Sequence, residues 1–288
     1  NAYSTYSVSY DQKIPVGRYD YFGIGGTLWG DKAGELNFAT VTGKLSGSYS
    51  KRMGGGRKES HYLVVGAEAG LSQRSLDFTL AKWGTQHDGQ GGYDPDAPSY
   101  ENGNFDDFEF LFADLAAGLL WFSVWDENNL YVGGSFHHLN RADQSFNSKN
   151  NDYIYSRFTA HVGGEFEVTP RVGLVPGIIV MKQGPSFQLN SGTSLKFTLG
   201  HGKGRFSNYQ AFHVGTWVRI SNKIESGVLT DAVILQTRFD YNQFTLGFSY
   251  DVNVSALKPA SSNNGAFEFA LQYKFCNNER RGVYCPNF

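Results

Sequence analysis

The residues in this chain that could carry chemistry are a few histidines and serines. His137, His138 and His161 fall on neighbouring predicted strands, but no carboxylate or thiol stands at a metal-ligand spacing from them. The serines have no G-x-S-x-G motif, and no histidine and aspartate follow in the order of a nucleophilic triad. We therefore predict no metal, no cofactor and no enzymatic activity.

Four aspartates in one segment could attract calcium: Asp94, Asp96, Asp106 and Asp107. Their spacing lacks the central glycine and the terminal glutamate of an EF-hand loop. A solvated surface loop is the interpretation that this spacing favours.

The elements that must position these residues are strands. Near the C-terminus, large apolar residues alternate with small or polar ones in two successive segments, 244–252 and 266–275. Successive side chains of a strand point to opposite faces, so each segment has one apolar and one polar face. Such a sheet is either a soluble one covering a core or a transmembrane barrel with a polar lumen.

The same alternation recurs along the whole chain and predicts about 13 strands. Helical periodicity is never sustained. The predicted strands cover residues 3–12, 20–30, 36–50, 60–75, 112–124, 129–139, 153–168, 171–182, 186–199, 208–220, 231–241, 243–252 and 265–275.

Composition supports the membrane alternative. Of the 288 residues, 40% are hydrophobic and 16% aromatic, yet the mean hydropathy is only -0.38. No apolar run approaches the roughly 20 residues of a spanning helix, whereas barrel strands need about 9–11 alternating residues. A net charge of -2 gives no electrostatic footprint for nucleic acid.

Short and long connections alternate along the chain, as in outer-membrane barrels with periplasmic turns and extracellular loops. We therefore predict an all-β, antiparallel transmembrane β-barrel over residues 1–275, with both termini periplasmic. An even strand count implies about 14 strands, of which the first precedes Asn1. The predicted long loops are 76–110, 140–152, 221–230 and 253–264.

Two groups of residues are candidates for function in such a barrel. The loop 76–110 is unusually aromatic, which is typical of an interface, although the same rings could fold inward to plug the barrel. The polar strand faces would line the lumen, either as a filter or as purely structural ion pairs. The predicted partner-binding residues are Trp83, His87, Tyr93, Tyr100, Phe105 and Phe108, and the predicted lumen-lining residues are Arg157, His161, Glu165, Arg219, Arg238 and Asp240.

The two cysteines, Cys276 and Cys285, both lie in the tail 276–288. Their spacing permits a disulfide in an oxidising compartment, and two free thiols are the alternative. The tail is predicted to be periplasmic.

Several stretches resemble the PorP/SprF family of Bacteroidota outer-membrane proteins. Short motifs occur in the order of that family across most of the chain, and the start of the chain lacks the segment that usually precedes them. The motifs are Asp31-Lys32-Ala33-Gly34, Gln73-Arg74-Ser75-Leu76-Asp77-Phe78, Gly118-Leu119-Leu120-Trp121, His138-Leu139-Asn140-Arg141 with Gln144-Ser145-Phe146, Phe248 to Leu257, and Cys285-Pro286-Asn287-Phe288.

The resemblance implies a part in type IX secretion and gliding motility. It implies a non-enzymatic barrel in the lipid bilayer that binds, helps export or anchors a secreted protein through its type B C-terminal domain. Other secretion components on the periplasmic side are implied as further partners. The alternative function is an outer-membrane channel for small solutes or apolar molecules.

Overall fold

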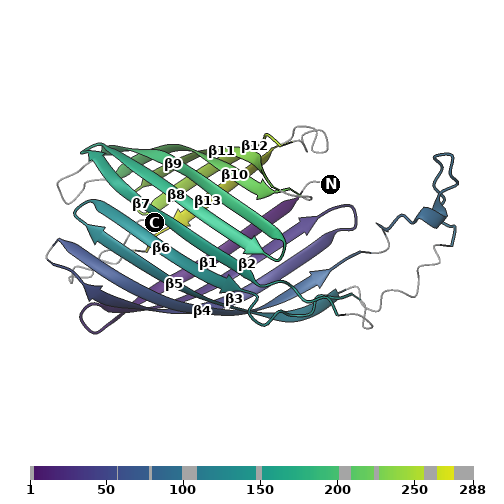
Figure 1. The fold of residues 1–288 in the computed structure, drawn as a ribbon, viewed down its shortest axis with the longest axis horizontal. Coiled ribbons are helices and arrows are strands. Elements are labelled where there is room, and N and C mark those ends of the chain that lie inside the picture. Colours follow the sequence, from purple (N-terminus) through teal and green to yellow (C-terminus); the bar gives the residue numbers. More distant parts are fainter. Residues whose placement is uncertain are drawn as a thin grey trace. The chain divides into compact units, whose positions relative to one another are not determined.

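The computed structural model describes residues 3–56, 58–77, 80–98, 109–146, 151–200, 209–223, 227–255 and 265–275. These residues form thirteen β-strands (Figure 1). The strands are β1 (Ser4–Val16), β2 (Asp20–Ala33), β3 (Phe38–Gly54), β4 (Glu59–Ser75), β5 (Glu109–Trp125), β6 (Asn128–His137), β7 (Arg157–Thr169), β8 (Val172–Gln183), β9 (Ser186–Gly200), β10 (Gln210–Asn222), β11 (Val228–Tyr241), β12 (Phe244–Asn253) and β13 (Ala266–Tyr273).

The strands form one sheet in which each strand pairs with its neighbours in the sequence. The predicted fold class, all-β and antiparallel, is confirmed, and this strand order is consistent with a β-barrel. Within the described residues the sheet is not closed, because β1 and β13 stand at its two ends. No helix in the described part of the chain has the length and hydropathy needed to cross a membrane.

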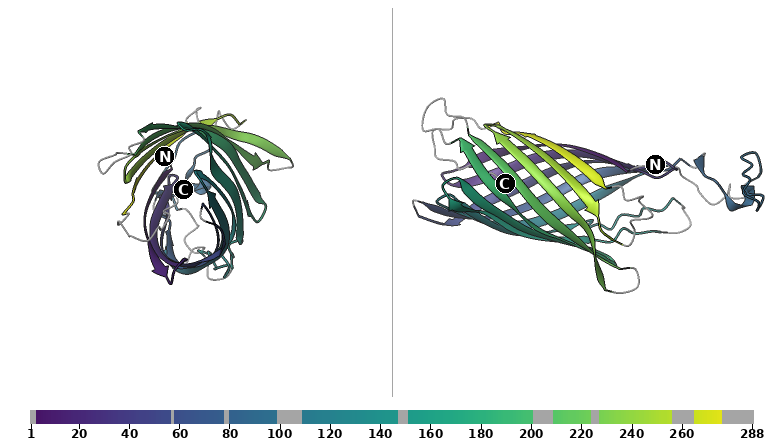
Figure 2. Two further views of the ribbon diagram at one scale, coloured as in Figure 1. Left: turned by 90° about the vertical axis from the view of Figure 1, so that its left-hand side faces the viewer. Right: turned by 90° about the horizontal axis from the view of Figure 1, so that it is seen from above.

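The chain divides into two compact units that share this strand order. One unit comprises residues 1–54, 62–121 and 134–158, and the other comprises residues 55–61, 122–133 and 159–288. Figure 2 shows neighbouring strands of each unit running side by side.

The alternation predicted near the C-terminus is present as two faces of the sheet. Register pairs join Leu235 to Tyr250 and Tyr250 to Phe267, which places three large apolar side chains in one row across β11, β12 and β13. These side chains are exposed. The adjacent row, on the opposite face, is polar and consists of Gln236, Ser249 and Glu268.

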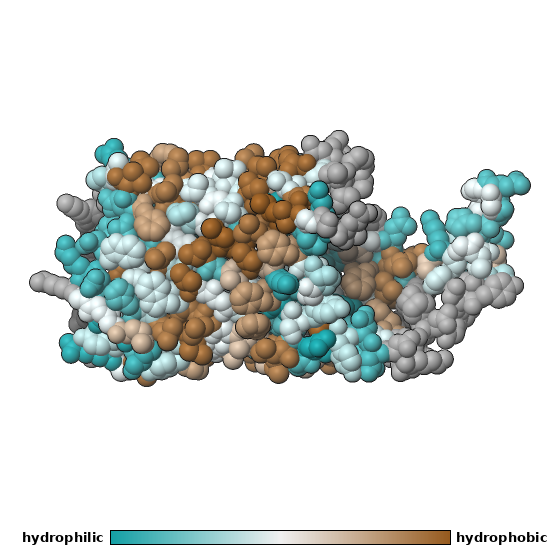
Figure 3. Space-filling model, in the orientation of Figure 1, coloured by the Kyte–Doolittle hydropathy of each residue, from teal (hydrophilic) through white to brown (hydrophobic). Residues whose placement is uncertain are grey.

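Burial is inverted relative to a soluble protein. Large apolar side chains on most strands are exposed, whereas many of the buried side chains are polar, including Thr42, Asp114, His213 and Asp240. On the face shown in Figure 3, hydrophobic side chains gather over the middle of the strands and hydrophilic ones toward the strand ends. Such extensive apolar exposure fits a sheet that meets lipid rather than water.

Several predicted strand boundaries are wrong by a few residues, and two of these differences have a visible structural reason. The sequence predicts that the first strand ends at residue 12, but β1 continues to Val16 and Pro15 pairs with Tyr21. A proline is tolerated there because β1 is the end strand of the described sheet, where a missing N–H breaks no second ladder. The sequence also starts a strand at residue 153, but Tyr153 instead bridges to Asp143 within a connection.

Glycines allow one bulky ring to lie against the polar face of the second unit. Gly177 pairs with Gly192, which pairs with Trp217. A Cβ added at Gly192 would lie 2.4 Å from Trp217 Cγ and 2.4 Å from the Thr216 carbonyl oxygen. The indole therefore occupies the space that a side chain at Gly192 would need.

We expect Gly192→Ala to destabilise the protein by about 1–3 kcal/mol, because the added methyl group overpacks against Trp217 and the backbone. Gly247→Ala is a matched control on the same face, since its Cβ would lie 3.7 Å from the nearest atom, Ala270 Cβ. Thermal unfolding in detergent measures both variants. Equal unfolding temperatures for the two would contradict the packing argument.

Candidate functional site

Residues 80–98, in the connection between β4 and β5, form a compact structure that we call the knob. Its centre is Gln86, which is buried and ends the 3-10 turn η2 (Gly84–Gln86). The Gln86 amide nitrogen donates to the carbonyl oxygens of Ala97 at 2.9 Å and Pro95 at 3.3 Å. Its amide oxygen accepts from the Trp83 backbone N–H at 3.2 Å. One glutamine side chain thus ties both ends of the knob together.

A tight turn forms the tip of the knob. His87 and Tyr93 make a β-bridge, and Gly89 and Gly91 have positive φ angles of 76° and 90°. The Asp88 carboxylate accepts from the backbone N–H groups of Gln90 at 2.8 Å and Gly92 at 2.9 Å.

These two hydrogen bonds hold the pKa of Asp88 below its ordinary value, because they stabilise the charged carboxylate. The bond from the Gln90 N–H has the larger effect, followed by that from the Gly92 N–H. The stabilisation is therefore present above the ordinary carboxyl pKa of about 3.9 and is lost as pH falls through the lowered pKa.

The knob contains three of the predicted partner-binding residues, Trp83, His87 and Tyr93, and brings the last two into contact. The rings of His87 and Tyr93 have centroids 5.3 Å apart, and the Lys82 ammonium lies 5.7 Å from the Tyr93 ring centroid. Trp83 precedes η2, and its backbone N–H donates to the Gln86 side chain while its carbonyl oxygen accepts from the Gln86 backbone N–H. Tyr100, Phe105 and Phe108 lie outside the described residues, as do Cys276 and Cys285.

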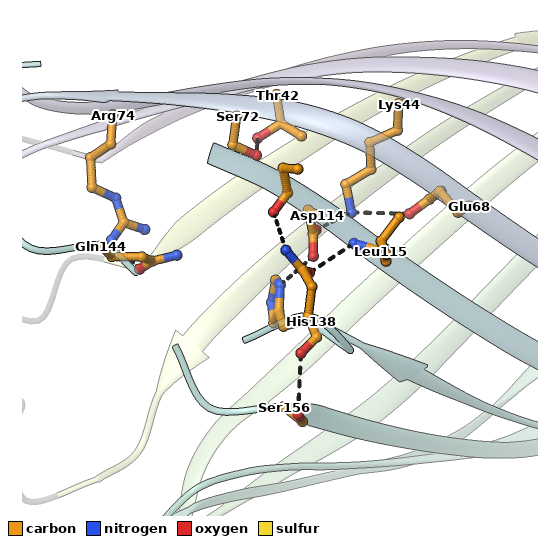
Figure 4. Close-up of polar contacts among 12 residues, drawn as sticks. Thr42, Lys44, Glu68, Ser72, Arg74, Asp114, Leu115, His138, Gln144 and Ser156 are labelled. Carbon is orange, nitrogen blue, oxygen red and sulfur yellow. Dashed lines mark hydrogen bonds and ion pairs between the residues drawn. The ribbon is translucent and has the colours of Figure 1, made fainter. Parts of the chain in front are cut away.

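A second cluster, which we call the Asp114 network, lies on the polar face of the first unit (Figure 4). Asp114, in β5, is only 4% exposed. Its carboxylate accepts from Lys44 Nζ of β3 at 2.9 Å and from His138 Nδ1 at 2.8 Å. Lys44 also donates to Glu68 of β4 at 3.0 Å. The network joins three strands to the residue that follows β6.

The Asp114 network holds the start of the connection 138–156. His138 has a positive φ of 57°, and its carbonyl oxygen accepts from Ser156 Oγ at 3.1 Å. The Asn140 side chain bonds to the backbone of β5 on both sides of Asp114. Its amide nitrogen donates to the Ala113 carbonyl oxygen at 2.7 Å, and its amide oxygen accepts from the Leu115 N–H at 3.2 Å. The His-Leu-Asn-Arg motif is therefore an anchor between this connection and β5.

A third motif residue, Arg74 of β4, completes the anchor. Arg74 donates to the side-chain oxygen of Gln144 (Figure 4). Its guanidinium carbon lies 5.2 Å from the Phe38 ring centroid and 5.7 Å from that of Phe112. Motifs that are distant in the sequence thus meet through Arg74 and Gln144.

The second unit carries ion pairs on its polar face that involve four of the predicted lumen-lining residues. Arg219 Nη2 lies 2.6 Å from Asp251 Oδ2, and Lys196 pairs with Glu165. Asp240 accepts from His213 at 3.1 Å, Arg238 at 2.9 Å and Thr245 at 2.8 Å.

The other two predicted lumen-lining residues make different contacts. The His161 ring lies against Tyr131, with centroids 5.8 Å apart. Arg157 begins β7, and its Nε has no hydrogen-bond partner within the part of the chain that the structure describes. Among the described residues, no three His, Cys, Asp or Glu side chains are grouped as metal ligands.

The residues predicted to be functional do not include Lys44, Glu68, Asp114, Lys196 or Asp251. Each occupies a polar position of an alternating strand, which is the one signal that could have identified it. Gln86 lies in a connection with no periodicity, and nothing in the sequence distinguishes it.

We expect Asp114→Ala to destabilise the protein by about 3–5 kcal/mol, because Lys44 and His138 would lose their shared buried partner. Asp126→Ala serves as the control, since Asp126 is 61% exposed in its pair with Lys58 and should cost at most about 1 kcal/mol. Urea unfolding in detergent compares the two. Similar losses for both variants would refute the view that Asp114 is a structural anchor.

The comparison with known families agrees with the motifs. A family model described as type IX secretion system membrane protein PorP/SprF matches residues 1–273, a range that contains all of the described strands. No curated protein matches the chain. The resemblance drawn from the motifs is therefore confirmed, and this chain belongs to the PorP/SprF family of type IX secretion system membrane proteins.

Proposed function

We propose that this protein is a non-enzymatic outer-membrane component of the type IX secretion system that binds a secreted protein through its type B C-terminal domain. In this proposal, the bound protein is exported past the barrel or anchored to it at the cell surface. The observation that carries the proposal is the knob, a connection that is folded by its own side chains and carries aromatic rings on its surface.

The geometry of the knob suits recognition. Tyr93 is 37% exposed and His87 is exposed beside it, while Gln86 fixes the backbone beneath them. A surface that is ordered before binding loses less conformational entropy when a partner docks. Aromatic residues on such a surface are typical binding hot spots.

The ion pairs on the polar face of the second unit support a protein-binding function rather than a solute channel. Charged selectivity filters present rings of side chains with one sign of charge. In the second unit, Arg219, Arg238 and Glu165 each have a partner of opposite charge. Mutual neutralisation supports a structural role for these residues and leaves the knob as the better candidate for function.

We further propose that the long connections face the cell exterior and that the short turns face the periplasm. Family membership supports a membrane location in type IX secretion. The lengths of the connections support this orientation, because the β4–β5 connection spans 33 residues, 76–108, whereas β5 and β6 are joined by two residues. The tail 276–288 would then be periplasmic, where Cys276 and Cys285 could form a disulfide.

We expect replacement of residues 82–98 by a Gly-Ser linker to reduce recovery of the secreted partner at least about tenfold, because the aromatic contact surface would be lost. The measurement is a mild-detergent pull-down of the tagged protein, with partners quantified by mass spectrometry. Gln86→Ala should reduce recovery in the same direction by loosening the knob. Asp126→Asn, at an exposed position in the β5–β6 turn, is the control and should leave recovery unchanged.

Undiminished recovery from a folded protein that lacks the knob would disprove the proposed binding surface. Heat-modifiable migration in gels reports whether each variant is folded, so a folding defect is distinguished from a binding defect. Absence of any type IX C-terminal domain from the wild-type pull-down would disprove the partner class itself.

The proposed orientation predicts which positions are labelled on intact cells. In a background with Cys276→Ser and Cys285→Ser, Asp96→Cys should react with a membrane-impermeant maleimide. Asp126→Cys, in the two-residue β5–β6 turn, should react only after the outer membrane is permeabilised. Both native side chains are exposed, so the reverse pattern would mean the reverse orientation.

A further inference from the structure

The short-turn end of the first unit carries an arrangement of charges and rings outside the knob and the Asp114 network. The turn between β1 and β2 consists of Gly17, Arg18 and Tyr19, and Lys51 and Arg52 lie near the end of β3, beside Asp20. The guanidinium carbons of Arg52 and Arg18 lie 4.5 Å and 5.1 Å from the Tyr19 ring centroid. Two cations therefore flank one exposed tyrosine.

Asp20 fixes the position of Lys51 in this arrangement. One Asp20 oxygen accepts from Lys51 Nζ at 3.0 Å and from the Tyr49 hydroxyl at 2.9 Å. The other oxygen accepts from the Arg52 backbone N–H at 3.0 Å. A lysine ammonium has three donors, so Lys51 retains donors beyond the one that Asp20 uses. The Lys51 side chain is 59% exposed.

The register shows that Lys51 lies on the same face of the sheet as a row of exposed apolar side chains. Ile14 pairs with Phe22, and Phe22 pairs with Tyr49, which makes one row across β1, β2 and β3. These three side chains are 38%, 39% and 41% exposed, as expected where the sheet meets lipid tails. Lys51 is two residues beyond Tyr49 and therefore on the same face.

Lys51 thus lies one row nearer the turn than Tyr49, close to the turn end of the strands, where lipid headgroups meet a membrane protein that spans the bilayer with its strands. Tyrosines are enriched at this level, and both Tyr19 and Tyr49 are exposed there. Exposed bases near the surface attract anionic lipids. This end of the unit carries three cationic side chains, those of Arg18, Lys51 and Arg52, and one carboxylate, that of Asp20, so these four residues have a net positive charge.

We propose that this turn end binds the phosphate of an anionic phospholipid headgroup, with Lys51 and Arg18 as the cationic ligands. Tyr19 and Tyr49 lie at the headgroup level beside them, and Asp20 is a positioning residue that holds Lys51. The site goes beyond the proposed binding of a secreted protein, since it lies at the other end of the strands and takes a lipid.

The test uses the full-length protein in detergent micelles doped with phosphatidylglycerol or, as the zwitterionic comparison, phosphatidylcholine. Native mass spectrometry counts the bound lipid across a titration. Wild type should retain phosphatidylglycerol in preference to phosphatidylcholine. Arg18→Gln combined with Lys51→Gln should weaken phosphatidylglycerol binding about thirtyfold, since each surface base contributes roughly a factor of five.

Lys223→Gln is the matched control. Lys223 is also an exposed base at a strand end, but it follows β10 at the long-connection end. This variant should bind phosphatidylglycerol as wild type does. Arg18→Gln alone, at an exposed position in a turn, provides a second variant if the double substitution impairs folding, and it should weaken binding about fivefold.

Two results would overturn the proposal. Equal phosphatidylglycerol affinity for wild type and the double variant, or an equal loss in Lys223→Gln, would mean that no localised headgroup site exists. Displacement of the lipid by millimolar inorganic phosphate would mean that the site takes a free anion instead of a lipid headgroup.

Discussion

A sheet that faces lipid must satisfy its backbone N–H and C=O groups without water, and this requirement governs the rest of the structure. Here β2 to β12 meet it by pairing with both neighbours in the sequence, and within the described residues β1 and β13 pair on one edge. Because such pairing places alternate side chains on opposite faces, one set of residues must be apolar and the other set is withdrawn from the lipid. The rows that contain Tyr250 and Ser249 show the two consequences side by side.

The polar face creates a second requirement, since charges that are removed from bulk water need partners. Lys44 lies between Glu68 and Asp114, and Asp240 accepts from three side chains. These contacts hold strands together through their side chains in addition to their backbones. Pairing also removes most of the free charge from this face, so the strands themselves offer few groups for recognising a ligand.

Alternation explains why the strands could be predicted from the sequence and the contacts between them could not. All thirteen described strands overlap a predicted segment, because a period of two is visible within ten residues. The partner of a polar residue depends on register across strands, which a local pattern does not contain. In the sequence, Asp114 is therefore indistinguishable from other polar strand residues, although in the structure its carboxylate joins Lys44 to His138.

The knob and the lipid site at Lys51 could be predicted from the sequence only in part, because a local pattern does not show which residues will be in contact. Aromatic composition was enough to select the loop that contains Trp83, His87 and Tyr93. Its organisation by Gln86 was not predictable, because a single amide that bonds to Pro95 and Ala97 leaves no repeating pattern. Likewise, the position of Lys51 next to the apolar row of Phe22 and Tyr49 follows from the strand register and could not be predicted from the local sequence.

The ends of the strands are where such a protein is free to vary its chemistry. Lipid constrains the outer face to apolar side chains, and ion pairing constrains the polar face, but neither applies to residues beyond the last backbone pair. The knob depends on contacts within residues 83–97, so its surface can change without disturbing strand pairing. The proposed partner-binding surface therefore lies where side chains can change without altering the sheet.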